Sequence, residues 1–172
     1  MIKKYELLDE PGTKLKRIRA TRDFADLGAG DLGGLIESEC NLSHDGNAWV
    51  YREARVSDNA FVYDNAWVSG DTWVYGNAVV SGNAVVCGEA RVYGNAQVSD
   101  TARVYGEARV YGNARVYGNA RVYDNAWVSD NARVSGNALV SGNAWVSGNA
   151  WVSGNARAAD NEHVARPGEV TK

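Results

Sequence analysis

Valine recurs at every sixth position from Val50 to Val152, and an alanine series two residues earlier runs from Ala48 to Ala156, with Thr72 as the one exception. The repeating unit is Asn-Ala-x-Val-(Tyr/Ser)-(Gly/Asp). A six-residue spacing advances about 600° around an α-helix, so the valines would spread over every face and a helix is excluded. In an extended segment, residues two apart share a face. Each unit therefore predicts a short strand with Ala and Val inward, and with x and the Tyr or Ser outward.

The last residue of each unit and the first of the next predict a corner. Gly or Asp followed by Asn tolerates the left-handed backbone that β-branched residues resist. Short strands joined by such corners wind into a parallel solenoid. An acid replaces the usual corner Asn at intervals of 18 residues, at Glu53, Asp71, Glu89 and Glu107. Three units per turn are thus favoured, and the predicted fold is an all-β, triangular, parallel β-solenoid with 18 residues per coil.

Residues 1–34 do not repeat, and they predict an N-terminal cap. Lys4–Leu8 and Leu15–Thr21 are typical strands on either side of a turn, which makes a β-hairpin. A cap is needed because an open solenoid end exposes unpaired strand edges. We expect the repeat domain to span residues 35–166 and a C-terminal tail to span residues 167–172. The decay of the pattern at Ala158 and Glu162, followed by Pro167, predicts a second cap at this end.

One irregularity interrupts the start of the repeat. Ile36 and Leu42 begin the inward series, but Val50 follows Leu42 by eight residues instead of six. The segment from Ser43 to Gly46 therefore predicts a two-residue insertion.

Charge and composition narrow the possible partners. The formal net charge is -3 and the pI is about 5.4, which argues against nucleic acid as a partner. No apolar run approaches the roughly 20 residues that span a membrane, and residues 1–10 lack the apolar core of a secretory signal. A cytoplasmic location is the resulting expectation. Cys40 and Cys87 fit neither a zinc spacing nor a disulfide framework, so both are predicted to be reduced.

Candidate catalytic chemistry is sparse. The chain has two histidines. His163 falls at an outward position of the last coil and is predicted to be a surface residue, whereas His44 lies in the insertion beside Asp45, which could orient an imidazole. No metal site is predicted. The acidic column could attract Ca²⁺, but three of its acids are followed two residues later by Arg, and a surface charge ladder is the simpler interpretation.

Aromatic residues at the outward x position are the strongest functional signal. They are Trp49, Phe61, Trp67, Trp73, Trp127, Trp145 and Trp151. Contiguous exposed aromatics mark association sites, and Arg and aromatic residues dominate interface hot spots. Folding the units onto three walls predicts one interface wall, made of Trp73, Tyr75, Arg91, Tyr93, Arg109, Tyr111, Trp127 and Trp145. Self-association is the leading interpretation. A glycan or another protein as partner, or a surface merely filled with residues of high β propensity, are the alternatives.

Written as Val-Tyr-Gly-Asn-Ala-Arg-Val, the unit resembles the hexapeptide repeat of the left-handed parallel β-helix superfamily, best known from trimeric acyltransferases. The stretch from Arg17 to Phe24, with Gly33-Gly34-Leu35-Ile36 and Asn41-Leu42-Ser43, is similar to YdcK-like bacterial proteins. Such arrays also occur in phage and prophage genes. The resemblance implies a left-handed coil and a homo-oligomer, in the form of a trimer.

Two functions from different classes follow. The leading hypothesis is a non-catalytic solenoid scaffold or binding protein without a cofactor. The alternative, implied by the resemblance, is an acyltransferase that uses His44 as general base with acetyl-CoA bound between subunits. The same superfamily includes carbonic anhydrases, whose zinc site resembles a three-histidine site. This chain has only two histidines and cannot supply such a site.

Overall fold

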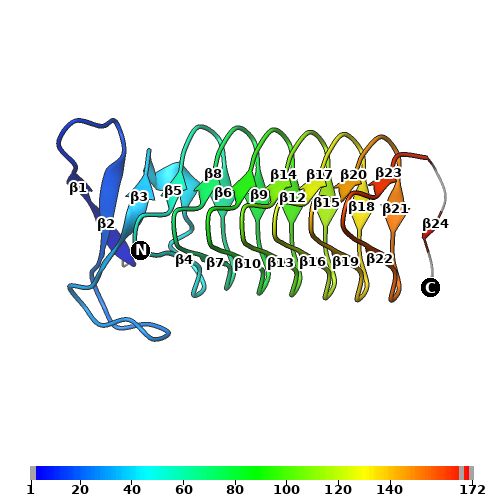
Figure 1. Cartoon of the computed structure of the whole chain (residues 1–172). Coiled ribbons are helices and arrows are strands. Elements are labelled where there is room, and N and C mark those ends of the chain that lie inside the picture. The colour runs from blue at the N-terminus through cyan, green and yellow to red at the C-terminus, as the bar shows by residue number, and fades with distance from the viewer. Residues whose placement is uncertain (1–2, 167–168, 171–172) are drawn as a thin grey trace.

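The computed structural model describes residues 3–166 and 169–170, and the repeat forms a straight solenoid closed at its N-terminal end by a small antiparallel sheet (Figure 1). Three sheets make up its walls, and the strands of the coils pair in parallel within each sheet. The first wall, in spatial order, consists of β1 (Tyr5–Asp9), β2 (Lys16–Ala20), β3 (Leu32–Ile36), β5 (Arg55–Val56), β8 (Trp73–Val74), β11 (Arg91–Val92), β14 (Arg109–Val110), β17 (Trp127–Val128), β20 (Trp145–Val146) and β23 (His163–Val164).

The other two walls contain two-residue strands only. The second wall consists of β4 (Trp49–Val50), β7 (Trp67–Val68), β10 (Val85–Val86), β13 (Arg103–Val104), β16 (Arg121–Val122), β19 (Leu139–Val140) and β22 (Arg157–Ala158). The third wall consists of β6 (Phe61–Val62), β9 (Val79–Val80), β12 (Gln97–Val98), β15 (Arg115–Val116), β18 (Arg133–Val134), β21 (Trp151–Val152) and β24 (Glu169–Val170). A 3₁₀ turn, η1 (Glu39–Asn41), is the one helical segment of the described chain.

The register confirms the predicted 18-residue triangular coil. Val104 pairs with Val86 on one side and with Val122 on the other, and the same offset recurs on all three walls. Residues 18 apart therefore lie above one another, and the acids from Glu53 to Glu107 form one column. The left hand of the coil stays a prediction from the resemblance.

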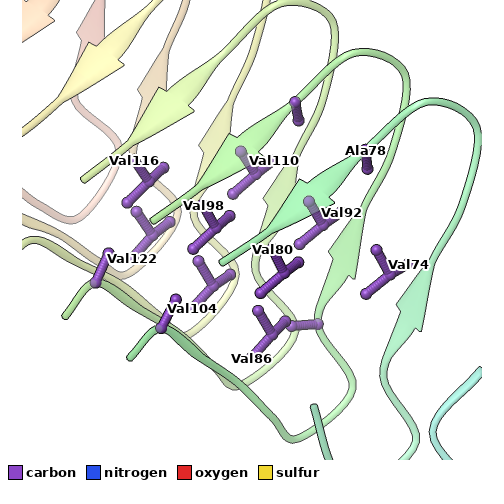
Figure 2. Packing of buried hydrophobic residues seen from close by; sticks show 14 of the residues in the cluster. Val74, Ala78, Val80, Val86, Val92, Val98, Val104, Val110, Val116 and Val122 are labelled. Carbon is purple, nitrogen blue, oxygen red and sulfur yellow. The ribbon is translucent and has the colours of Figure 1, made fainter. Parts of the chain in front are cut away.

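The interior is filled by the valines and alanines of the repeat. Every valine of the inward series from Val50 to Val152 has no exposed surface. Figure 2 shows them pointing into the coil in rows, with Val80, Val98 and Val116 in one row and Val86, Val104 and Val122 in another. The core is a narrow column of small side chains, so each coil is supported mainly by its two neighbours.

Corners follow the backbone chemistry of the repeat. Glycine or aspartate occupies the left-handed position, as at Gly106 with a φ of 70° and Asp124 with a φ of 58°. The following asparagines form hydrogen-bonded ladders from coil to coil, and the longest runs through Asn59, Asn77, Asn95, Asn113, Asn131 and Asn149. Amide ladders of this kind fix the register that the valines alone would leave free to slip.

The N-terminal hairpin is present as predicted, and it continues the first wall. β1 and β2 pair antiparallel, β2 pairs antiparallel with β3, and β3 pairs parallel with β5. The boundary expected after residue 34 falls inside β3, so the cap and the coils share one continuous sheet. Gly33 is required here because a Cβ would lie 2.6 Å from both the Val50 carbonyl oxygen and the Ile18 side chain.

The first coil contains the predicted insertion. Ile36 pairs with Val56 and Leu42 bridges to Val62, so these partners are 20 residues apart instead of 18. At the other end, β24 pairs with β21 and extends the third wall beyond residue 166. Within the expected C-terminal tail, residues 167–168 and 171–172 lie outside the described residues.

One expectation about the surface is wrong. Trp49 was expected to face solvent, but its side chain is completely buried. The cap folds over this end of the second wall and brings Tyr5 and Phe24 edge-on to the Trp49 ring, at centroid distances of 6.1 and 5.3 Å. The other six outward aromatics are exposed as expected: Phe61, Trp67, Trp73, Trp127, Trp145 and Trp151.

Candidate functional site: an aromatic and arginine wall

The residues predicted for the interface lie together on the outer face of the first wall. Their strands pair in register, so that Trp73, Arg91, Arg109, Trp127 and Trp145 form one row along the solenoid. A parallel row is formed by Tyr75, Tyr93 and Tyr111. We call these eight residues the tryptophan–arginine wall.

The tyrosine row is a close stack. Tyr75 and Tyr93 are 4.9 Å apart between ring centroids, Tyr93 and Tyr111 are 5.0 Å apart, and both pairs are within 3° of parallel. Burial in this stack raises the pKa of Tyr93, and the neighbouring tyrosines raise it further. The stack leaves the rings little freedom, so this part of the surface is rigid before any partner binds.

The tryptophan rings are held by their neighbours. The Trp145 indole nitrogen donates to Ser129 Oγ at 3.0 Å, and the Trp73 indole nitrogen donates to Ser57 Oγ at 3.3 Å. The Arg109 guanidinium lies 5.0 Å from the Trp127 ring centroid, which is a cation–π distance. Each ring therefore keeps a defined orientation while about two fifths of its surface stays exposed.

Two open grooves mark the ends of the wall. One, of about 400 Å³, is lined by Glu107, Arg109, Asn125, Trp127, Asn143 and Trp145. The other, of about 660 Å³, lies where the hairpin loop overhangs Trp73, and its lining includes Lys14, Arg55 and Asp58. Apolar ring surface is thus concentrated at both ends of the wall, with the arginines between them.

Sequence reasoning missed two members of this surface. His163 lies one coil beyond Trp145 and stacks on its ring at 4.7 Å, and its Nε2 is 2.9 Å from Ser147 Oγ. Arg55 lies one coil before Trp73. The spacing of 18 applied once more in each direction identifies both residues. His163 is exposed, as expected for a surface residue.

The acidic column differs from the predicted charge ladder. Glu53 pairs with Arg17 of the cap, with 3.3 Å between Oε2 and Nη2. In the part of the chain that the structure describes, Glu89 and Glu107 form no ion pair with the arginines two residues later. The intervening alanine points inward, and neither pair approaches to ion-pair distance. These carboxylates and guanidiniums therefore have no ion-pair partner among the described residues. The same described residues contain no group of three His, Cys, Asp or Glu side chains that could hold a metal ion.

His44 lies in the predicted insertion of the first coil, packed beneath the cap and away from the tryptophan–arginine wall. Its ring stacks on Tyr5 at 4.2 Å, and its Nδ1 accepts a hydrogen bond from the Lys4 backbone nitrogen at 3.2 Å. The Nε2 is buried without a hydrogen-bond partner and stands 4.0 Å from Glu39 Oε2. Burial lowers the His44 pKa. This arrangement fixes the cap to the first coil, and a role of His44 as general base stays a prediction.

Cys40 and Cys87 are both free thiols, and burial raises the pKa of Cys87. Neither belongs to the tryptophan–arginine wall. Among the described residues no helix has the length and apolar character needed to cross a membrane.

The fold and the surface together define a β-solenoid repeat protein with a row of tryptophan and arginine side chains on its first wall. We compared the chain with known protein families. The model of the YdcK β-solenoid repeat matches overlapping stretches between residues 54 and 88 and between residues 108 and 148. The matched stretches are therefore similar to the YdcK β-solenoid repeat. A search of curated proteins found no match. The wider relation to hexapeptide acyltransferases and to prophage proteins stays a prediction.

Proposed function

We propose that the protein is a non-catalytic β-solenoid scaffold that associates with further copies of itself through the tryptophan–arginine wall. The observation that carries this proposal is the in-register row of exposed Trp and Arg side chains beside a rigid tyrosine stack. Trp, Tyr and Arg are the residues most enriched in interface hot spots, and a surface that is ordered before binding loses little entropy on association.

Charge complementarity favours a second copy as the occupant of the wall. Glu89 and Glu107 come two residues before Arg91 and Arg109, and in the described chain no ion pair joins these acids to these arginines. Another copy presents the same two unpaired rows, so the acids of one copy can meet the arginines of the next. Complementary rows of this kind set the orientation and register of association.

The scaffold proposal predicts a specific loss of assembly. The double variant Trp127→Ala with Trp145→Ala removes the apolar surface of one groove, so its mass measured by light scattering should fall toward that of one chain. Trp151→Ala is the matched control, because Trp151 is equally exposed but lies on the third wall. It should keep the oligomer, and all variants should melt as the natural protein does. A monomeric natural protein, or an unchanged mass in the double variant, would contradict the proposal.

A charge exchange tests the pairing of acids with arginines independently. Arg109→Glu alone and Glu107→Arg alone should each weaken association, because like charges then face one another. Mixed in equal amounts, the two variants should form a hetero-oligomer. If mixing restores nothing, the wall does not pair acids with arginines between copies.

A further inference from the structure

Arginine at the outward positions is concentrated in the middle coils along the solenoid. At the outward x position the middle coils carry three in-register arginine pairs, one on each wall: Arg91 with Arg109, Arg103 with Arg121, and Arg115 with Arg133. Like charges directly opposite one another across neighbouring strands are destabilising. The pairs therefore call for an explanation other than the stability of the fold.

The pair on the third wall has the most positive surroundings. The corner column that leads into this wall is the hydrogen-bonded amide ladder from Asn59 to Asn149, whereas the corresponding column of the first wall carries acids. Two acids stand on the adjoining corners, and both are engaged with backbone. Asp100 accepts from the Gly118 nitrogen and Asp130 accepts from the Gly148 nitrogen, each at 2.9 Å. Neither Arg115 nor Arg133 forms an ion pair within the described residues.

A small groove lies over this pair. It has a volume of about 200 Å³ and is lined by Gln97, Ser99, Arg115, Tyr117 and Arg133. All five side chains can donate a hydrogen bond, and none of them is an acid. A concave site in which every side chain can donate, and in which two are guanidinium groups, matches a group that carries several acceptor oxygens and negative charge.

We propose that this groove is a binding site for a tetrahedral oxyanion, namely a phosphate or sulfate group. Arg115 and Arg133 approach the anion from neighbouring strands, with their backbones about 4.8 Å apart. Gln97, Ser99 and Tyr117 supply neutral donors to the remaining oxygens. The bound anion removes the repulsion between the two arginines, so binding stabilises the folded protein. With a net charge of -3, the protein has no general attraction for anions, and selectivity must come from the groove.

An NMR titration tests the site with the whole chain. Inorganic phosphate, sulfate and glycerol phosphate are added at constant ionic strength, and the side-chain signals of Gln97 and of the arginines are followed. Saturable shifts at the groove are expected. Tighter binding of glycerol phosphate than of inorganic phosphate would identify an esterified group as the natural ligand, and the reverse would identify the free anion.

The control variants separate a built site from diffuse charge. Arg115→Gln with Arg133→Gln should weaken binding about tenfold or more, since charge-assisted hydrogen bonds are lost. Tyr117→Phe should weaken it less. Arg103→Gln with Arg121→Gln removes an equivalent pair from the second wall and should leave the affinity unchanged. Equal losses in both double variants, or no saturable shift in the natural protein, would overturn the proposal.

Discussion

Lys4 is a lysine whose side chain is entirely buried at the junction of cap and first coil. Its Nζ donates to the Ala48 carbonyl at 2.9 Å and to the Gly46 carbonyl at 3.4 Å, and it lies 5.3 Å from the Phe24 ring centroid. Among the described residues no carboxylate forms an ion pair with the Nζ, although the nearby charge of Asp45 acts to raise the Lys4 pKa. Burial lowers the pKa of Lys4 to about 8. The charge is therefore only partly compensated, and the cap is held by a group that titrates at mildly alkaline pH.

This pKa predicts that stability rises with pH. Between pH 8 and the ordinary pKa of a lysine side chain, Lys4 is protonated in the unfolded chain and deprotonated in the folded protein. The free energy of unfolding therefore increases by about 1.4 kcal/mol per pH unit over this range. From about pH 8 to pH 9.5 we expect a gain of about 2 kcal/mol in urea unfolding, and Lys4→Met should lack it. Burial raises the pKa of Tyr5, which reverses the slope above pH 10 because the unfolded state then loses its phenolic proton first. An equal slope in Lys4→Met would show that Lys4 is not the group responsible.

At the scale of the single element, the corner decides whether a coil can stack on the next. Asp124 combines a φ of 58° with a hydrogen bond from the Gly142 nitrogen to its Oδ2 at 3.2 Å. It thus tolerates the left-handed backbone and links two coils at the same time. Glycine provides only the first of these properties.

Asp124→Ala should therefore cost more than Asp124→Gly. Alanine loses the carboxylate and is also strained at positive φ, which together cost about 1 to 3 kcal/mol of unfolding free energy. Asp124→Asn keeps an acceptor oxygen and should cost least. Thermal or urea unfolding of the three variants checks this order. If the alanine variant were as stable as the glycine variant, the left-handed conformation would not limit this corner.

The periodic elements could be predicted from the sequence, and the contacts of the cap could not. Val104 belongs to a series of valines spaced by six residues. This spacing alone predicts that Val104 lies in a strand, that its side chain points inward and that it pairs with the valines 18 residues before and after it. Trp49 has the same phase, yet Tyr5 and Phe24 cover it from a segment without a repeat. Its burial depends on how the cap folds back, and nothing in the local pattern encodes that. The environment of His44 was beyond sequence reasoning for the same reason, while the tryptophan–arginine wall follows directly from the spacing.

At the scale of the whole molecule, the solenoid behaves as a row of mutually dependent coils. Each coil contacts only the coil before it and the coil after it, and none has a core of its own. Damage to the middle of the row therefore removes support on both sides.

Val104→Asp should consequently prevent folding. Val104 is fully buried between Val86 and Val122, and an unpaired carboxylate there has no partner or water. Arg103→Asp makes the same change one residue earlier on the exposed face and should alter the unfolding free energy by less than about 1 kcal/mol. Circular dichroism and urea unfolding distinguish the two. A folded Val104→Asp protein would mean that the column of valines is not a closed core.

The eighteen-residue register also links the number of residues in the solenoid to the direction in which each downstream side chain points. Inserting one whole coil would lengthen the rod and leave every downstream side chain pointing where it did before. Inserting a single six-residue unit would preserve each strand and each corner, yet it would swing everything beyond it by a third of a revolution. With the insertion placed between Tyr93 and Trp127, Trp127 and Trp145 would then lie on a different wall from Tyr75 and Tyr93. Growth by complete turns is thus the only kind that keeps a long face intact.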